Sequence, residues 1–494
     1  MRESKRTEEK RGNSPDAVIR AEKERKGMQE QKERSKARAV AEAVKRRGGR
    51  TFYVGGSVRD EILGSRPGED IDLEVHGIPP EQLEQILDEL GGFTTVGKCF
   101  GIYGLKGSSL DIAMPRLETA TGRGHRDFQV FVDPDLGPAK AARRRDFTVN
   151  AMMEDVLTGE IVDPFGGRQD LEAGVLRHVD STSFAEDPLR VLRCARFAAR
   201  LGFSVAPETM QLCRSMDLTV LPAERVFGEL ENALLKADRP SVFFQVLREM
   251  DQLADWFAEI GDLIGVEQSP VHHPEGDVWN HTMLVLDQAA RLRSGAKYAA
   301  SVLSPSSAAG FMLAALCHDL GKAVTTAIGN DGRIHAFQHE TRGIGIAETF
   351  LKRITGNKKL TAYVKNMVWL HMKPNMAAGA GSKKKSTSRM FDQSADPEGL
   401  LLLARADHLG RTGAVINEEY EAFLYARLCW YREVMDRPFV RGEDLIRAGM
   451  KPGAEFSEML AYAHKLRLAG IPKEEALRQT IACGRKGFCQ KKKK

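Results

Sequence analysis

The stretch TFYVGGSVRDEILGSRPGEDIDLEV, residues 51–75, decides the fold of the first part of this chain. Its first four residues, TFYV, are mostly apolar and predict a short strand, and a Gly-Gly pair then leads into a predicted helix over 57–64. Residues 71–75 alternate apolar and acidic side chains, a period of two that predicts a strand with one polar face. The strand–turn–helix–strand order indicates a small α/β unit.

Two acidic side chains, Asp70 and Asp72, lie two positions apart at the start of the second strand. Side chains on a strand alternate between its faces, so both carboxylates point to one side, about 7 Å apart. Oxygen ligands of this kind hold Mg²⁺ together with substrate phosphates, and two such ions support in-line displacement at phosphorus. Alone, a D-x-D pair is also typical of an exposed strand edge, so its neighbours decide between the two interpretations.

The neighbouring residues favour a phosphate-binding site. Gly55 and Gly56 allow backbone N–H groups to approach a triphosphate closely, and a helix begins beside them. Arg59 lies in the first turn of that helix, within reach of a phosphate. Downstream, ARRRDFTVNAM places three arginines before Asp146, and guanidinium groups bind phosphates through two hydrogen bonds at once. A plain tight turn and a solvated basic face are the alternatives.

A further block, EDPLRVLRCAR, repeats charged side chains every three residues on one helical face: Asp187, Arg190, Arg193 and Arg196. An Asp accepts a hydrogen bond from an exocyclic amine of a base, and an Arg donates to a ring acceptor. Cytosine and adenine present that combination, whereas uracil and guanine present a carbonyl there. Such a pair would select C and A without a template, unless the stripe is only a surface of ion pairs.

Together, in this order and spacing, the four blocks resemble the class II tRNA nucleotidyltransferases: the bacterial CCA-adding enzymes and the related poly(A) polymerases of the DNA polymerase β superfamily. The resemblance covers residues 50–250. It implies addition of CCA to the 3′ end of tRNA from CTP and ATP, with Mg²⁺ held by catalytic Asp70 and Asp72. It also implies nucleotide contacts from Gly56, Arg59, Arg145, Asp146, Asp187, Arg190, Arg193 and Arg196.

Two more features belong to the same comparison. Asp111, in the strand LDIAM, is a candidate third carboxylate, with a surface or hydrogen-bonded role as the alternative. The segment 116–127 occupies the position of a loop that the family associates with addition of the final A, and an ordinary polar loop is its alternative.

A second cluster of histidines and acids occurs in the helical part of the chain. The stretches NHTMLVLD, CHDLGK and ARADH contain His281, the pair His318–Asp319, and Asp407. A buried, unpaired Asp is costly, so a metal or a hydrogen-bonding partner is needed, and such N and O ligands suit Mg, Mn, Ni or Co.

This pattern resembles the HD phosphohydrolase superfamily, whose members hydrolyse 2′,3′-cyclic phosphates, 2′-nucleotides and simple phosphate esters. The resemblance implies that His281, His318, Asp319 and Asp407 bind a divalent transition metal (Ni, Mn or Co) or Mg. His339 and His371 would complete the site or contact phosphate. A structural, metal-free domain is the alternative.

Length and composition set the broad class. With 494 residues the chain has room for roughly three domains, and 42% hydrophobic residues can form a sizeable core. It contains no run of about 18 apolar residues and no apolar signal at its start, so we expect neither a membrane nor a secreted protein. The cysteines form no C-x-x-C pair and indicate reduced thiols in the cytoplasm: Cys99, Cys194, Cys213, Cys317, Cys429, Cys483 and Cys489.

Positive charge is concentrated at the two ends. Residues 1–50 hold 17 Lys and Arg against 9 Asp and Glu, and the last ten residues hold six more positive charges. Basic ends attract polyanions such as RNA, although a solvated, disordered leader is equally compatible with this composition.

The sequence therefore predicts an α+β protein: a polymerase β-like nucleotidyltransferase head followed by all-helical neck, HD and tail domains. The expected segments are a basic leader (1–48), disordered or an exposed helix; the head (49–178); the neck (179–255); the HD domain (256–430), with a Gly/Ser/Lys-rich loop over 375–397; and the tail (431–494).

The predicted function is CCA addition with an auxiliary HD hydrolase. The expected partners are tRNA, ATP and CTP, with no membrane, and the oligomeric state stays open. A poly(A) polymerase or an enzyme adding only CC or only A shares the same chemistry. More distant alternatives are an HD phosphohydrolase with an RNA-binding head and an RNA-binding protein without catalysis.

Overall fold

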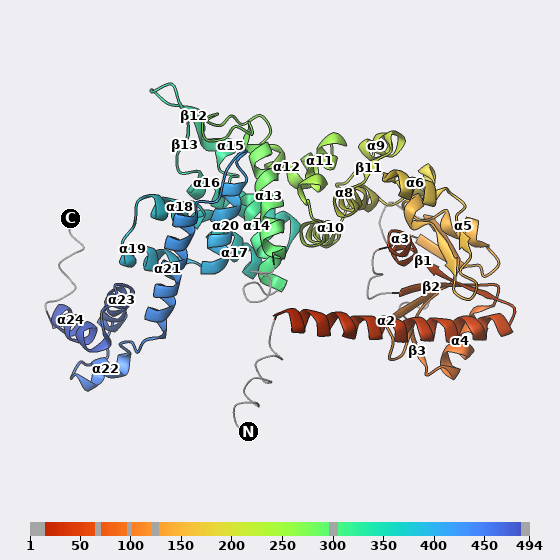
Figure 1. Cartoon of the computed structure of the whole chain (residues 1–494), viewed down its shortest axis with the longest axis horizontal. Helices are drawn as coiled ribbons and strands as arrows, with labels where there is room; N and C mark the ends of the chain where they lie inside the picture. The colour runs from red at the N-terminus through yellow and green to blue at the C-terminus, as the bar shows by residue number, and fades with distance from the viewer. Residues whose placement is uncertain (1–14, 65–70, 96–100, 121–127, 296–304, 486–494) are drawn as a thin grey trace. The chain divides into compact units, whose positions relative to one another are not determined.

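The computed structural model describes residues 15–64, 71–95, 101–120, 128–295 and 305–485 (Figure 1). Asp70 and most of the predicted loop over 116–127 lie outside these ranges. The chain forms two compact units, Met1–Leu221 and Pro222–Lys494, and the division falls within the predicted neck. None of the helices in the described ranges is long and apolar enough to span a bilayer.

The first unit begins with the long helix α2 (Pro15–Arg46), which lies alongside β1, β2 and α4 (Figure 1). Its second half is buried through Ala37, Val40, Ala41 and Val44, which recur at helical spacing. Glu33, also buried, accepts hydrogen bonds from the Ser108 hydroxyl and the Ser109 backbone N–H. Of the two expectations for the leader, disorder or an exposed helix, the helix is therefore correct for residues 33–44, but one face of it is buried against the head.

A seven-stranded sheet forms the centre of the head, in the order β3-β4-β5-β2-β1-β8-β9. All its pairings are antiparallel except that of β2 with β5. The strands are β1 (Arg50–Val54), β2 (Ile71–His76), β3 (Phe93–Thr95), β4 (Ile102–Leu105), β5 (Leu110–Ala113), β8 (Met153–Asp155) and β9 (Ile161–Val162).

Short helices accompany the sheet: α3 (Gly56–Ile62), α4 (Pro80–Glu89), α5 (Pro138–Ala142) and α6 (Gly167–Ala173). A separate hairpin pairs β6 (Arg116–Ala120) with β7 (Phe128–Val132). The predicted polar loop thus begins in a strand, and residues 121–127 lie outside the described ranges.

Helix α8 (Leu189–Leu201) packs onto the head through aromatic side chains. The Phe147 ring meets the rings of Phe184 and Phe197 edge-on, with centroids 5.6 and 5.8 Å apart. The guanidinium of Arg196, a predicted nucleotide contact, lies over the Phe197 ring at 4.0 Å. Around α8 lie α7 (Ser181–Ala185), α9 (Pro207–Arg214) and a parallel pair of two-residue strands, β10 (Val175–Leu176) and β11 (Ser204–Val205).

Within its described residues, the second unit is helical apart from one hairpin, β12 (Thr326–Ile328) with β13 (Ile334–Ala336). Its helices are α10 (Ala223–Lys236), α11 (Ser241–Glu249), α12 (Ala254–Gly261), α13 (Val278–Ser294), α14 (Pro305–Cys317), α15 (Lys322–Thr325), α16 (His339–Ile354), α17 (Lys358–Leu370), α18 (Met372–Gly379), α19 (Lys384–Gln393), α20 (Pro397–Leu409) and α21 (Glu418–Asp436).

A side-chain cap fixes the first residue of α13 and of α20, the helices that carry His281 and Asp407. Asp277 accepts a hydrogen bond from the Asn280 N–H at 2.9 Å at the start of α13. Asp396 accepts from the Gly399 N–H at 2.8 Å at the start of α20, where Pro397 occupies the first helical position.

The predicted loop over 375–397 is instead mostly helical, in α18 and α19. The run of lysines misled the prediction, because Met390 and Phe391 later in α19 are buried and anchor the helix. The Lys384 ammonium lies 3.7 Å from the centre of the Trp430 ring.

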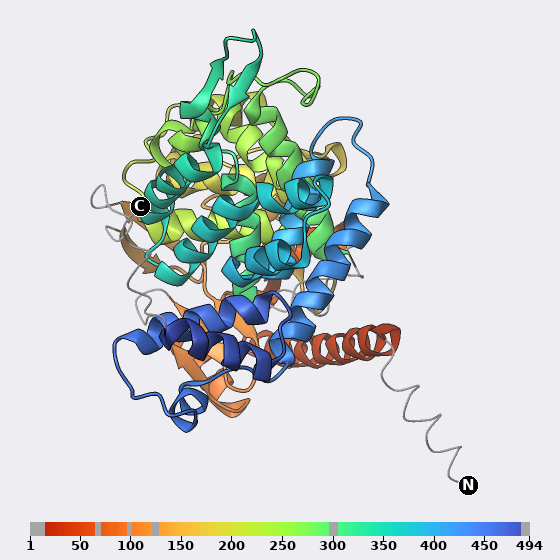
Figure 2. The same cartoon turned by 90° about the vertical axis from the view of Figure 1, so that its left-hand side faces the viewer.

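The last three helices, α22 (Gly442–Arg447), α23 (Glu455–Leu468) and α24 (Lys473–Arg485), have a small core of their own. Figure 2 shows them in dark blue as a separate group within the second unit. Leu445 and Met459 lie fully buried at its centre.

Candidate functional site

The Gly-Gly turn, a carboxylate and a guanidinium meet at one end of β1 and β2. A Cβ atom on Gly55 would lie 3.7 Å from Oδ2 of Asp72 and 3.4 Å from Nη1 of Arg145. Gly55 has φ +74° and ψ −135°, a conformation that L side chains rarely adopt, so glycine is required at this turn. The predicted catalytic Asp72 therefore lies beside two other predicted parts of a triphosphate site.

Asp111 is placed next to Asp72 by strand pairing. The parallel strands β2 and β5 align so that these two residues are direct Cα partners. Both side chains are exposed, as carboxylates that meet a substrate must be. The pairing supports the prediction of Asp111 as a further carboxylate at this site.

Arg59 is enclosed beneath the turn. It is 1% exposed, and its guanidinium donates to Asp60 Oδ1 at 2.8 and 2.6 Å and to Asn150 Oδ1 at 2.6 Å. A Cβ on Gly56 would lie 3.3 Å from Arg59 Nη2. In this structure the buried Arg59 guanidinium packs against Gly56 of the turn. Its contact with a phosphate stays a prediction.

Two predicted nucleotide-binding residues, Asp146 and Arg193, bind each other. Asp146 Oδ2 accepts a hydrogen bond from Arg193 Nε at 2.8 Å, while Oδ1 accepts from the Phe147 N–H and from Asn150 Nδ2. Burial alone raises the pKa of Asp146, but the Arg193 charge and these hydrogen bonds hold it below its usual value. The pair joins α8 to the loop that carries the arginine run.

The predicted base-reading residues lie at the start of α8. Asp187 Oδ1 accepts from the Leu189 N–H at 3.1 Å. Arg190 donates to the backbone carbonyl oxygens of Ser183 and Arg144, at 2.5 and 2.6 Å. Arg190 thus positions the arginine run as well as standing beside Asp187.

Glu74, which was not predicted as a site residue, is a fully buried carboxylate two residues after Asp72 on β2. His76 Nε2 lies 3.0 Å from its Oε1, while Arg145 Nη2 and Arg144 Nη2 lie 3.2 and 3.4 Å from its Oε2. Glu74 therefore orients Arg145 beside Asp72. The available signal was the third acid in the D-x-D-x-E alternation, which requires a positive partner if it is buried.

The ionisation of Glu74 gives a testable dependence of stability on pH. Burial alone raises its pKa, but the hydrogen bond with His76 and the charges of Arg145 and Arg144 outweigh burial and lower the pKa to about 2. Because the folded-state pKa lies below the unfolded value of about 4.3, ionised Glu74 stabilises the fold above that pH. This stabilisation is lost as the pH falls toward 2.

We expect Glu74→Gln to lower the free energy of unfolding at pH 7 by roughly 3 kcal/mol. The variant should also lose part of the decline in stability between about pH 5 and pH 2. Denaturant titrations over this range measure both effects, with the exposed Glu81→Gln as control. The same pH dependence in Glu74→Gln and parent would contradict the assignment.

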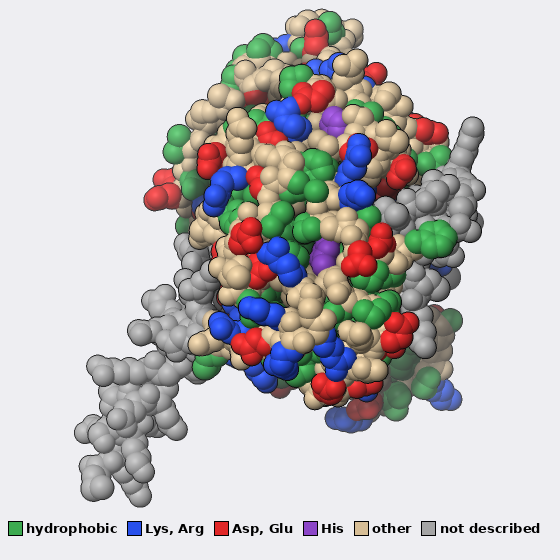
Figure 3. All heavy atoms as spheres, turned by 90° about the vertical axis from the view of Figure 1, so that its right-hand side faces the viewer, with side chains coloured by type: hydrophobic (Ala, Val, Ile, Leu, Met, Phe, Trp, Pro, Cys, Tyr) green, Lys and Arg blue, Asp and Glu red, His purple; other side chains and the backbone are tan. Residues whose placement is uncertain are grey.

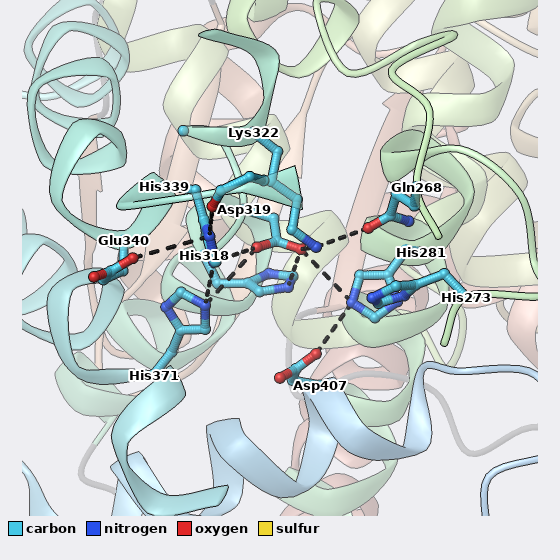
Figure 4. A network of polar contacts seen from close by, with 12 residues as sticks. Gln268, His273, His281, His318, Asp319, Lys322, His339, Glu340, His371 and Asp407 are labelled. Carbon is cyan, nitrogen blue, oxygen red and sulfur yellow. Dashed lines mark hydrogen bonds and ion pairs between the residues drawn. The ribbon is translucent and has the colours of Figure 1, made fainter. Parts of the chain in front are cut away.

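The four predicted HD residues come together in the second unit (Figure 4). His281 comes from α13, His318 and Asp319 follow α14, and Asp407 comes from α20. His281 Nε2 lies 3.1 Å from Asp407 Oδ1 and 3.7 Å from Asp319 Oδ2, and His318 Nε2 lies 3.2 Å from the same Asp319 oxygen. All four side chains are buried.

His339 and His371 lie at the other oxygen of Asp319. Their Nε2 atoms are 3.3 and 3.8 Å from Asp319 Oδ1 and 3.3 Å from each other. Burial, together with the charge of the neighbouring His318, lowers the pKa of His371 to about 4. The structure thus gathers all six residues that the sequence singled out in this region.

The arrangement of donor atoms fits a divalent metal. Nδ1 of His318 lies 2.8 Å from the Ala315 carbonyl oxygen, which can only accept, so that nitrogen carries the proton. The lone pair of His318 Nε2 then faces the carboxylate of Asp319, and this buried nitrogen has no hydrogen-bond partner of acceptable geometry among the described residues. A ring nitrogen without a hydrogen-bond partner beside a buried carboxylate suits a divalent cation, in addition to the Lys322 ammonium, which lies 2.7 Å from the same carboxylate oxygen.

Residues outside the predicted set hold the ligands in place. Glu275 Oε1 lies 2.8 Å from Nδ1 of both His281 and His273, and Glu275 Oε2 accepts from the Thr412 N–H. These contacts lower the pKa of Glu275 to about 2, although burial by itself raises it. A carboxylate on the far nitrogen fixes the tautomer of a metal-binding histidine.

Lys322 adds a positive charge to this region (Figure 4). Its Nζ lies 2.7 Å from Asp319 Oδ2 and 2.7 Å from Gln268 Oε1. Neither Glu275 nor Lys322 was predicted, because each has a partner that is distant in the sequence. These partners are Thr412 for Glu275 and Gln268 for Lys322.

A close backbone approach follows the His-Asp pair. A Cβ atom on Gly321 would lie 2.0 Å from the carbonyl oxygen of His339. We expect Gly321→Ala to reduce the free energy of unfolding by roughly 1–3 kcal/mol, because backbone cannot move aside cheaply. Thermal melting tests this against Gly345→Ala, whose Cβ would meet nothing within 4 Å, and equal stability of both variants would contradict it.

Comparison with known proteins defines the class. Residues 51–177 match the family described as Poly A polymerase head domain, and residues 278–412 match the HD domain. The chain is therefore a nucleotidyltransferase head followed by an HD domain, which confirms the predicted fold class. Both families are metal-dependent.

Relatives narrow the class to one family. The Multifunctional CCA protein of Alkalilimnicola ehrlichii is 36% identical over 439 residues, which cover 86% of this chain and 98% of the relative. That of Methylococcus capsulatus is 36% identical over 445 residues, covering 87% and 96%. The chain belongs to the multifunctional CCA protein family and is a CCA-adding tRNA nucleotidyltransferase.

Solved structures share its fold. The Thermotoga maritima CCA-adding enzyme complexed with tRNA has a TM-score of 0.59 at 19% identity, over 91% of this chain and 94% of that one. The Bacillus stearothermophilus enzyme in complex with CTP has a TM-score of 0.60 at 22% identity, over 90% and 96%.

Proposed function

We propose that the head builds the 3′-terminal CCA of tRNA from CTP and ATP around Asp70 and Asp72, and that the HD domain hydrolyses phosphate esters. The observation that supports the first activity is the convergence of Asp72, Arg145 and the Gly55 turn. Family membership and the structural relatives bound to tRNA, ATP or CTP support the choice of substrates. We place both activities in the cytoplasm, where tRNA is available to them.

In the proposed reaction the 3′-hydroxyl oxygen of tRNA attacks the α-phosphorus of the nucleotide. An O–P bond forms and the hydroxyl releases its proton to solvent, while the bond from the α-phosphorus to the bridging oxygen breaks and pyrophosphate leaves. Arg145, held by Glu74, and the backbone of the Gly55 turn bind the triphosphate. Mg²⁺ held by the two aspartates would neutralise the charge that develops on the phosphate oxygens.

Asp187 and Arg190 would select the base. A single-nucleotide assay tests this: tRNA lacking its last three residues is incubated with Mg²⁺ and CTP, ATP, UTP or GTP alone. We expect incorporation from CTP and none from UTP or GTP, with ATP used on tRNA that already ends in CC. Equal use of all four nucleotides would contradict base selection, and a long A tail would indicate a poly(A) polymerase.

tRNA would be held by its backbone and shape, as A-form helices generally are. On the face shown in Figure 3, Lys and Arg side chains are interspersed with Asp and Glu, and neither charge covers that face alone. We therefore expect separate arginine contacts to phosphates, supplemented by the basic ends of the sequence, of which residues 1–14 and 486–494 lie outside the described residues.

The HD activity is supported by the six buried donor side chains of Figure 4. His281, His318, Asp319 and Asp407 would hold a divalent metal such as Ni, Mn, Co or Mg, which would polarise a phosphate ester toward attack by water. Cyclic phosphates or terminal phosphates at damaged 3′ ends of tRNA are the proposed substrates. Release of product from a 2′,3′-cyclic nucleotide with each metal tests this activity separately from nucleotide addition.

A further inference from the structure

Helix α2 lies before the part of the chain that matches the head family, which begins at residue 51. Its consecutive residues Glu33 and Arg34 nevertheless contact two segments of the proposed nucleotidyltransferase site, the turn before β5 and helix α3. We propose that Glu33 is a positioning residue for nucleotide addition, which fixes the start of β5 and thereby holds Asp111 beside Asp72. The inference rests on the proposed addition of nucleotides at Asp72.

The turn between β4 and β5 is held by the Glu33 carboxylate. Glu33 Oε2 accepts a hydrogen bond from the Ser109 N–H at 3.1 Å and another from the Ser108 hydroxyl. The Ser108 hydroxyl oxygen accepts in turn from the Leu110 N–H at 3.2 Å. This chain of hydrogen bonds therefore extends from α2 to the first residue of β5.

Glu33 is 1% exposed, and a buried carboxylate costs free energy unless hydrogen bonds or a positive charge compensate it. Lys36 Nζ lies 3.0 Å from Glu33 Oε1 and also donates to the Gly107 carbonyl oxygen of the turn at 2.5 Å. An apolar residue would be enough to pack α2 against the head, as Ala37 and Val40 do. The hydrogen bonds to the turn are what the carboxylate adds.

The position of this turn determines which face of β5 carries Asp111. β5 has four residues, and its register pairs Asp111 with Asp72 on β2 and with Gly104 on β4. Leu110 and Ile112, on the other face, are buried, whereas Asp111 is exposed. Because side chains alternate between faces, a shift of one residue would turn Asp111 away from Asp72.

Arg34 connects the same helix to the other side of β2. Its Nη2 atom lies 2.7 Å from Glu61 Oε2 on α3, and its guanidinium lies 5.4 Å from the centre of the Tyr53 ring on β1. Helix α3 begins at Gly56, in the turn proposed to bind the triphosphate. In the sheet, β2 lies between β5 and β1, so α2 contacts segments on both sides of the strand that carries Asp72.

Hydrogen exchange of the full chain tests the positioning of β5 without using activity. The variant Glu33→Met keeps much of the volume of the side chain but offers no carboxylate oxygen to the turn. We expect the amides of residues 107–113 to exchange roughly tenfold faster or more, because hydrogen bonds to a charged group are lost. Glu33→Gln retains one acceptor oxygen and should show a smaller change.

The Mg²⁺ dependence of nucleotide addition tests the consequence for the site. Glu33→Met should raise the Mg²⁺ concentration for half-maximal CTP incorporation by on the order of tenfold, as loss of residues that orient metal ligands does. Binding of tRNA should stay at the parent affinity. Asp111→Asn should shift the Mg²⁺ midpoint in the same direction, and the double variant should show no further shift, because Glu33 acts through Asp111.

Glu42→Met is the matched control, since Glu42 is an exposed acid of the same helix. It should match the parent in exchange and in Mg²⁺ midpoint. Ser108→Ala removes the partner hydroxyl from the turn and should produce the same two changes if Glu33→Met fails to fold. Parent-like exchange of residues 107–113 in folded Glu33→Met, or equal changes in Glu42→Met, would overturn the proposal.

The two measurements separate this inference from the proposed function. Faster exchange in Glu33→Met, together with a parent that adds no nucleotides, would refute nucleotide addition and leave the positioning of β5 by Glu33 standing. Addition by the parent with an unchanged Mg²⁺ midpoint in Glu33→Met would refute the inference and leave nucleotide addition standing.

Discussion

Asp72→Asn is expected to reduce nucleotide addition to tRNA by roughly 10³-fold or more while HD hydrolysis stays at the parent rate. The carboxylate of Asp72 is one of the two proposed to hold Mg²⁺ and lies beside the Gly55 turn and Arg145. Its loss removes charge neutralisation at the reacting phosphate, which an amide cannot replace. Primer extension of a tRNA lacking its 3′ end, resolved on a sequencing gel, measures the rate.

The control for this experiment is Asp88→Asn, an exposed residue of α4 in the same unit. It should add nucleotides at the parent rate. If Asp72→Asn still adds nucleotides at the parent rate, the proposal that Asp72 holds the catalytic metal is contradicted. Equal loss of both activities would instead point to unfolding, which thermal melting of the variant would reveal.

The double variant His318→Asn, Asp319→Asn is expected to show the opposite pattern. Hydrolysis of a 2′,3′-cyclic nucleotide should fall by on the order of 10³-fold, because both side chains are proposed metal ligands. Asp319 also lies close to His318 through one carboxylate oxygen and to His339 through the other. CCA addition should continue, since these residues belong to the second unit and Asp72 belongs to the first.

The control is His335→Asn, which replaces a partly exposed histidine of the same unit that contacts Asp331. It should leave both activities intact. Undiminished hydrolysis by the double variant would show that the HD cluster is structural. Loss of CCA addition in a folded double variant would show that the two activities depend on each other.

Short-range patterns in the sequence were enough to predict the fold class and the family. The paired glycines and the alternation around Asp72 identified the strand–turn–helix–strand unit, and His318–Asp319 identified the HD region. These signals are local, because a strand or a helix determines which face its side chains share. Asp70 lies outside the described residues, so its pairing with Asp72 stays a prediction.

What the sequence did not provide are contacts between distant segments. Asp146 binds Arg193, 47 residues later, and Glu275 binds the Thr412 N–H, 137 residues later. No periodicity encodes such distances, and a buried carboxylate such as Glu74 cannot be told from a surface one by its neighbours alone. These residues became visible only once burial and partners were known.

Two segments were misread for a related reason. Residues 33–44 and 384–393 contain many charged side chains, so the first segment was expected to be disordered or an exposed helix and the second to be a loop. In both, a few apolar residues at helical spacing, such as Val40 and Phe391, are buried and fix the helix. Charged residues on the solvent-facing side of a helix do not destabilise the fold appreciably. The overall composition of these segments therefore did not predict that they are ordered helices.

The decisive measurement is the sequence of the 3′ ends formed when the purified chain meets Mg²⁺, CTP, ATP and a tRNA that lacks its last three nucleotides. Stepwise growth by C, C and A followed by a stop is the predicted result. Growth by a long run of A, by only CC or by only A, or no growth at all, would contradict the proposal that this chain completes the CCA end.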